Sequence, residues 1–239
     1  MKIFAIGDLH LSFDEKVQKP MDVFGGEWVD HAHRLKKNWL EKVSADDAVI
    51  ICGDISWGLR LEEAEADFNW LRQLPGRKFI FKGNHDLWWQ SAGKLNRLYG
   101  DENMIFVQNT AGIIDTGEER VALCGSRGWI CPGDPDFTEE DEKIYSRELQ
   151  RLAMSLEDGK RMNPDRILGV LHYPPTNDKM QSSGFTELMS SYGVSSCVYG
   201  HLHGAAICGA FQGEQDGIRY RLVSCDSLGL RLCPIWQTE

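Results

Sequence analysis

Five short motifs carry the side chains that could do chemistry, and each follows a short apolar stretch of the chain. They read Gly7-Asp8-Leu9-His10, Gly53-Asp54, Gly83-Asn84-His85-Asp86, Leu171-His172-Tyr173 and Gly200-His201-Leu202-His203, and they hold five of the seven histidines. Carboxylate, amide and imidazole groups together suit borderline divalent metals such as Mn, Fe, Co and Zn. Because Cys is absent from the motifs, a structural zinc site is disfavoured. The motifs therefore predict a metal site.

The number of candidate donors points to two metals. Seven donors are too many for one tetrahedral ion, whereas two ions that share a carboxylate would use them all. Paired metals hold the attacking and leaving oxygens of an in-line displacement, and a water that bridges them loses its proton near neutral pH. We expect two divalent ions per chain, with manganese as first choice among Mn, Fe, Zn, Co and Ni. The candidate metal ligands are Asp8, His10, Asp54, Asn84, His172, His201 and His203.

Buried strands are expected directly before the motifs, and helices between them. Residues just past the C-terminal ends of such strands converge on one crevice, which would bring the motifs together. The alternation of strands and helices indicates an α/β protein. Apolar runs predict strands at 3–6, 48–52, 78–81, 167–171 and 196–199, and helical spacing predicts helices at about 29–43, 61–74, 87–99 and 139–156.

The middle and the end of the chain show shorter strands joined by turns. These are expected at 104–107, 112–116, 120–124, 206–211 and 219–224, so the sheet is predicted to be mixed. We expect a single domain over residues 1–239. Residues 131–158 separate strand-like segments; they are interpreted as a cap over the site, or alternatively as an acidic helix start that faces water.

With these five motifs the sequence resembles the calcineurin-like metallophosphoesterases. Their pattern is D-x-H, then G-D, then G-N-H-[DE], then H, then G-H-x-H, and all five blocks occur here in order from Asp8 to His203. A single block is a weak signal, whereas five ordered blocks at expected strand ends are specific. The resemblance implies a small bacterial-type member whose fold is a sandwich of two mixed sheets flanked by helices.

The resemblance also implies a role for each motif residue. Asp8, His10 and His203 would hold the first metal; Asn84, His172 and His201 would hold the second. Asp54 would bridge both ions. His85 would bind no metal and would act near the leaving oxygen as a general acid or charge stabiliser, so that His85 and Asp54 are the candidate catalytic residues.

One block departs from the Ser/Thr protein phosphatases of this superfamily. Their second block reads G-D-x-V-D-R-G, whereas here it reads Gly53-Asp54-Ile55-Ser56-Trp57-Gly58. Trp57 stands where the second Asp, which hydrogen-bonds the catalytic His, is expected. Asp86 or another carboxylate would have to orient His85 instead. The departure favours a small phosphoesterase over a protein phosphatase.

Two further residues are candidate substrate contacts. Arg127 follows an expected strand and would make a bidentate contact with a phosphate group, or it is an arginine of a surface loop. His33, like His31, would reach the mouth of the metal site, or it sits on a solvated helix start.

Composition limits the classes of function and partner. The net charge of −10 disfavours long nucleic acids, and no apolar run is long enough to span a membrane. The short apolar start and the seven cysteines without a Cys-x-x-Cys pair predict a cytoplasmic protein with reduced thiols and no signal peptide.

We therefore expect a metal-dependent phosphoric ester hydrolase that acts on a small phosphorylated substrate, in which a metal-bridging hydroxide attacks a phosphate mono- or diester. The alternatives are a non-catalytic scaffold with this fold, a Ser/Thr-type protein phosphatase and a nuclease. The sequence does not separate monoesters from diesters, because the same metal pair serves both.

Overall fold

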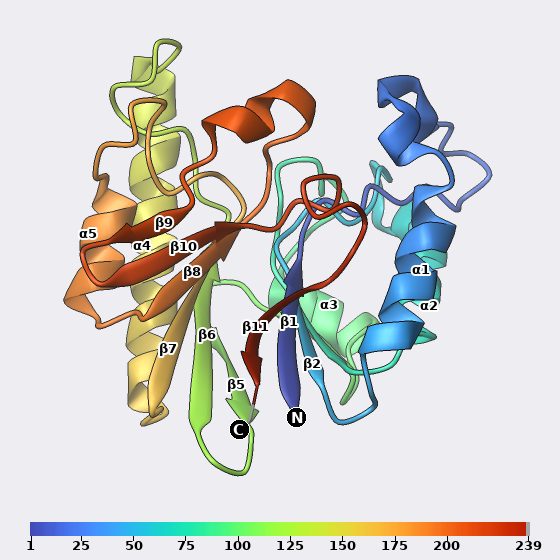
Figure 1. Ribbon diagram of the computed structural model, residues 1–239, viewed down its shortest axis with the longest axis horizontal. Coiled ribbons are helices and arrows are strands. Elements are labelled where there is room, and N and C mark those ends of the chain that lie inside the picture. The colour runs from blue at the N-terminus through green and yellow to red at the C-terminus, as the bar shows by residue number, and fades with distance from the viewer. Residues whose placement is uncertain (238–239) are drawn as a thin grey trace. The chain divides into compact units, whose positions relative to one another are not determined.

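The computed structural model describes residues 1–237, and these residues form two compact units. Unit 1 is made of Met1–Phe106 and the C-terminal segment from Val223; unit 2 is Val107–Leu222. Each unit has its own mixed sheet (Figure 1) and its own hydrophobic core. The prediction of a single domain over 1–239, whose last two residues lie outside the described part, stays a prediction.

Unit 1 contains a five-stranded sheet in the order β11-β1-β2-β3-β4. The strands β1 to β4 are parallel, and only β11 runs antiparallel, against β1. Ile3 lies beside Ala48, and Ala48 lies beside Arg77, so the three central strands end at nearly the same level. The strands are β1 (Lys2–Ile6), β2 (Ala48–Ile51), β3 (Arg77–Ile80), β4 (Met104–Phe106) and β11 (Cys233–Gln237).

Three α-helices belong to unit 1: α1 (His31–Lys42), α2 (Glu65–Arg72) and α3 (Ala92–Leu98). Their apolar residues recur at helical spacing and enter the core that the sheet residues also form. Short 3₁₀ turns, Met21–Phe24, Gly26–Trp28 and Leu61–Ala64, precede α1 and α2. The helices join the parallel strands, as crossover connections do.

Unit 2 contains a six-stranded sheet in the order β5-β6-β7-β8-β10-β9. The four central strands are parallel and the two edge strands antiparallel. Its strands are β5 (Ala111–Asp115), β6 (Arg120–Ser126), β7 (Arg166–Leu171), β8 (Ser196–Tyr199), β9 (Gly213–Gln215) and β10 (Ile218–Leu222).

Two helices, α4 (Glu139–Arg161) and α5 (Gly184–Ser191), lie side by side in unit 2 (Figure 1). Each begins with a capping box: the Thr138 hydroxyl accepts from Asp141 N, and the Ser183 hydroxyl accepts from Thr186 N. Close packing of α4 on β6 needs Gly159, because a Cβ there would lie 2.3 Å from the Cys124 sulfur.

The fold class is confirmed: the chain is α/β, with two mixed sheets and flanking helices. Among the described residues, no helix has the length and apolar character needed to cross a membrane. The α5 helix and strand β11 were not expected from the sequence.

Two expected elements differ from the structure. The strand expected at 206–211 is wrong, because Gly204–Gly209 forms a 3₁₀ helix whose residues are small and mostly exposed. The helix expected at 87–99 begins only at Ala92, after a loop that buries Trp88 and Trp89. Ser91 caps this helix by accepting from Lys94 N.

A buried carboxylate of α2 connects two loops of unit 1. One oxygen of Asp67 accepts from the Ser56 hydroxyl at 2.5 Å, and the other accepts from Phe13 N at 2.8 Å. Desolvation raises the pKa of Asp67 to about 6, against the lowering effect of the two hydrogen bonds. The folded protein therefore binds this proton more tightly than the unfolded chain does.

Replacing this group by Asp67→Asn should remove a pH dependence of stability. The raised pKa stabilises the fold below about pH 4, and this contribution is lost as pH rises through about 6. The free energy of unfolding of the wild type should fall, relative to the variant, by about 2 kcal/mol between pH 4 and 7. Urea unfolding measures it. The exposed Asp46→Asn variant is the control, and equal pH dependence in all three proteins would refute the prediction.

Candidate metal centre

The loops after β1 and β2 stay paired beyond the ends of the strands. Asp8 N donates to Gly53 O at 2.9 Å, and His10 N donates to Asp54 O at 3.0 Å. The pairing ends in a parallel bridge between Leu11 and Ser56. Asp8, His10 and Asp54 are thus fixed by backbone bonds at one end of the unit 1 sheet, and all three are buried.

Three of these candidate ligands have left-handed backbone conformations. The φ angles are 61° at Asp8, 46° at His10 and 52° at Asp54, and in unit 2 His201 has a φ of 74°. Residues other than glycine rarely adopt this region, which costs on the order of 1 kcal/mol or more per residue. Such strain persists where the surrounding structure imposes it and is concentrated at functional sites.

Asp86 fastens the β2 loop to the β3 loop. Its fully buried carboxylate accepts three backbone N–H groups: Asp54 N at 2.9 Å, Ile55 N at 2.9 Å and Gly83 N at 2.7 Å. In return the Asp54 carboxylate accepts from His85 N at 2.8 Å. Asp86 is therefore a positioning residue for Asp54, a role that the motif pattern had not assigned to it.

Glycine is required where these two loops touch. A Cβ on Gly83 would lie 2.0 Å from Asp54 Oδ1, and a Cβ on Gly53 would lie 2.5 Å from the Gly83 Cα. Gly53 also has a φ of 92°. The glycines of the second and third motifs thus allow the close approach of the loops that carry Asp54 and Asn84.

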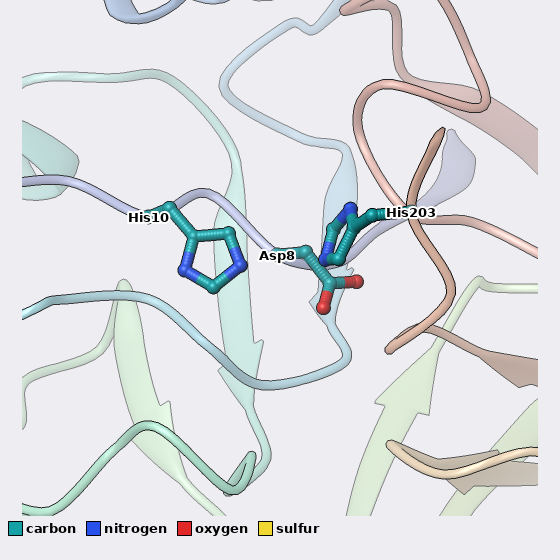
Figure 2. A group of neighbouring side chains, drawn as sticks. All are labelled: Asp8, His10 and His203. Carbon is teal, nitrogen blue, oxygen red and sulfur yellow. The ribbon is translucent and has the colours of Figure 1, made fainter. Parts of the chain in front are cut away.

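Unit 1 brings donor atoms within reach of one ion. Asp8 and His10 each offer a ligand atom within 4.8 Å of the other, and the same holds for Asp8 and Asp54. Figure 2 shows the Asp8 and His10 side chains on the chain that follows β1. Asn84 lies half-buried on the β3 loop. A buried carboxylate pair beside an imidazole is a donor set that fits a divalent metal.

His85 is exposed and lies against aromatic rings. Its ring centroid is 4.6 Å from Trp57 and 5.7 Å from His10, and Trp57 stacks on His10 at 4.6 Å. Trp57, which replaces the expected aspartate, therefore contacts His85 through its ring. Both oxygens of Asp86, the substitute considered from the sequence, accept backbone N–H groups.

Two residues that the motif analysis left unassigned support the β1 loop. His31 donates from Nε2 to Leu9 O at 3.1 Å, and burial lowers the pKa of His31, which favours its neutral form. The Cys225 thiol donates to Asp8 O at 3.0 Å. The position of His31 at the start of a helix gave some signal for the first contact, whereas nothing in the sequence pointed to Cys225.

Unit 2 holds its candidate ligands by carbonyl groups. The Arg127 carbonyl accepts from His172 N at 3.1 Å and Tyr173 N at 2.9 Å, and the His172 carbonyl accepts from Gly200 N at 3.1 Å. The loops after β6, β7 and β8 are thus linked in series. The rings of His172 and His201 lie 5.2 Å apart. His203, which Figure 2 also draws, follows two residues after His201 and is half-buried.

The two candidate substrate contacts have protein partners. The Arg127 guanidinium lies 3.3 Å from the buried Glu148 carboxylate and 4.5 Å from the Trp129 ring. Desolvation lowers the pKa of Arg127, against the effect of Glu148. His33 is 73% exposed and its Nδ1 lies 3.0 Å from Asp30. Substrate binding by Arg127 or His33 stays a prediction.

The segment 131–158 has two parts. The part from residue 139 onward belongs to α4, whose apolar side packs in the core of unit 2. The preceding loop lines a pocket that also includes His201. The cap interpretation stays a prediction, and the loop before α4 is the part that lies next to a candidate ligand.

Comparison with known proteins identifies a family. The profile of the calcineurin-like phosphoesterases matches residues 1–205, a stretch that contains all five motifs. A relative, the gene 66 protein of Mycobacterium phage D29, is 37% identical over 100 residues, which are 41% of this chain and 48% of the phage protein. The chain thus aligns with less than half the length of that relative.

Solved structures share the fold. The phosphopantetheinyl hydrolase of Mycobacterium tuberculosis has a TM-score of 0.53 at 15% identity, covering 99% of this chain and 96% of that one. The protein TT1561 of Thermus thermophilus has a TM-score of 0.53 at 12% identity, covering 84% and 81%. At these identities the likeness concerns the fold alone.

The substitution Gly83→Ala should disrupt the Asp54 loop. The added Cβ would overlap Asp54 Oδ1, so we expect the free energy of unfolding to fall by about 2–4 kcal/mol and manganese binding to weaken. Gly93→Ala is the matched control, because nothing lies within 4 Å of a Cβ there, and it should stabilise α3 by up to about 1 kcal/mol. Equal stability of the two variants would contradict the expected overlap.

The substitution Asp86→Asn should loosen the same loop without adding volume. An amide offers one acceptor oxygen where the carboxylate offers two, so at least one buried N–H group loses its partner, at a cost of about 2–4 kcal/mol. Urea unfolding measures the loss. Asp14→Asn is the control, since the Asp14 carboxylate accepts one N–H group at an exposed turn; a loss no larger than the control's would argue against the role given to Asp86.

Proposed function

Since the chain belongs to the calcineurin-like phosphoesterase family, we propose that it is a metal-dependent phosphoesterase that hydrolyses a small phosphate mono- or diester. The observation that carries the proposal is the strained backbone at Asp8, His10 and Asp54, three motif residues whose loops are fixed at one end of the unit 1 sheet. Strain of this kind is retained where a site needs it.

The proposed centre holds two divalent ions. Its candidate ligands are Asp8, His10, Asp54, Asn84, His172, His201 and His203. The mixture of carboxylate, amide and imidazole groups favours manganese, iron, cobalt, nickel or zinc. Ions held there would neutralise the charge of the phosphoryl oxygens and lower the pKa of a water molecule.

His85 is proposed to assist the leaving oxygen. Its side chain is exposed, while its backbone N–H is fixed on the Asp54 carboxylate. Contact with the Trp57 ring restricts the orientation of the imidazole. His85 would donate a proton or a hydrogen bond to the departing alkoxide, a contribution of typically 10²–10⁴-fold for a positioned acid.

A small substrate fits this chain better than a protein or a long nucleic acid. The second motif lacks the aspartate and arginine of the Ser/Thr phosphatases, and the net charge of −10 repels a polyanion.

We also propose a reducing, cytoplasmic setting. Burial raises the pKa of Cys124 and of Cys131 to about 12, which keeps both thiols protonated.

Hydrolysis of p-nitrophenyl phosphate and bis-p-nitrophenyl phosphate by manganese-loaded protein tests the proposal. We expect turnover of at least one ester, two metal ions per chain, and a loss of at least about 10³-fold in kcat for Asp54→Asn. A preference for the diester would identify a phosphodiesterase, and a preference for the monoester a phosphatase.

Metal content of single variants tests the proposed ligands one by one. His10→Ala in unit 1 and His203→Ala in unit 2 should each lower the manganese content below two ions per chain, measured by mass spectrometry after dialysis. His33→Ala is the matched control and should retain both ions, because this exposed histidine is not a proposed ligand. Full metal content in His203→Ala would exclude His203 as a ligand; two bound ions without turnover of any ester would favour the scaffold alternative.

A further inference from the structure

Unit 2 contains a pocket of about 340 Å³ whose wall includes His201. Tyr173 belongs to the same wall, and its ring stacks on the His201 ring with the centroids 4.0 Å apart. We propose that this pocket binds the organic group of the phosphate ester and selects a positively charged, partly apolar group such as an amino alcohol. The inference rests on the proposed function, because it takes His201 to lie at the reacting phosphate.

Two polar side chains hold the loops of the pocket in place. Asp134 accepts from Cys131 N at 2.9 Å and from Asp178 N at 2.7 Å. The Asn177 amide donates to Pro132 O at 3.1 Å, and its oxygen accepts from Gln181 N at 3.1 Å. These bonds connect the loop before α4 with the loop after β7. A pocket whose walls are fixed before binding loses less entropy when a ligand enters.

Apolar and aromatic side chains supply much of the surface. Ile130, Pro174, Leu202 and Phe211 line the pocket together with Tyr173. Methyl and methylene groups would be removed from water there, and the aromatic rings also attract an organic cation. The volume lies at the lower end of the roughly 300–1,000 Å³ that is usual for ligand pockets, so one small organic group fits and a polymer does not.

The charged side chains that line the pocket favour a ligand of positive charge. Three carboxylates, those of Asp134, Asp136 and Asp178, line the pocket, and no lysine or arginine is among the described residues that do so. A second phosphate or a carboxylate on the substrate would be repelled. A cationic group would be attracted by these carboxylates, of which those of Asp136 and Asp178 are exposed.

Esters whose second alcohol is cationic, neutral or anionic test this selectivity. The probes are p-nitrophenyl phosphodiesters whose second alcohol is choline, its uncharged carbon isostere 3,3-dimethylbutanol, or glycolate, together with the corresponding monoesters without the nitrophenyl group. With manganese-loaded protein, kcat/KM should be about tenfold higher for the choline ester than for the isostere, mainly through KM, and lowest for the glycolate ester.

A double variant assigns the preference to the pocket. In Asp136→Asn/Asp178→Asn the ratio between the choline ester and its isostere should fall to about twofold or less. Glu102→Gln/Glu118→Gln removes two exposed carboxylates elsewhere, changes the net charge equally and should keep the wild-type ratio.

Two results would overturn the inference in different ways. Turnover with no preference for the choline ester, or the same ratio in both double variants, would refute the selective pocket and leave the proposed function standing. Absence of turnover for every ester, while two metal ions are bound, would refute the proposed function and the inference with it.

Discussion

Buried carboxylates that accept backbone N–H groups hold the strand-end loops of unit 1, and the candidate ligands depend on them. Asp86 joins the β2 loop to the β3 loop, while Asp67 joins the β2 loop to the chain that follows β1. Charged acceptors make stronger hydrogen bonds than neutral ones, and burial makes the loss of a partner costly. This connection can therefore maintain positive φ angles at Asp8, His10 and Asp54 that an isolated loop would not adopt.

In unit 2, neutral backbone carbonyl groups hold the loops that carry candidate ligands. The carbonyl oxygens of Arg127 and His172 accept from the next loop in turn, so the loops that carry His172 and His201 are joined through the backbone. The Arg127 side chain meanwhile pairs with Glu148 and covers Trp129. The backbone carbonyl of Arg127 thus connects the loops, while its guanidinium contacts Glu148 and Trp129.

Each unit contains its own kinds of candidate functional groups. Unit 1 offers the carboxylates and the exposed His85, whereas unit 2 offers histidines and the pocket whose lining would choose the organic group of the substrate. One fold hosts many activities because the site and its pockets, and not the sheets, set the substrate. The family therefore limits the chemistry, and we propose that the loops around His201 decide the selectivity of this member.

The sequence by itself determined the class of fold and the candidate donors. Both can be read from local patterns, namely apolar runs followed by Gly-Asp or Gly-His motifs. It did not determine the roles of Asp86, Asp67, His31 and Cys225, which act through contacts between residues far apart in the chain. The stretch 206–211, apolar in sequence, begins within the 3₁₀ helix Gly204–Gly209 and contributes residues to the wall of a pocket. Local propensity is weak over six residues, and tertiary packing decides the conformation there.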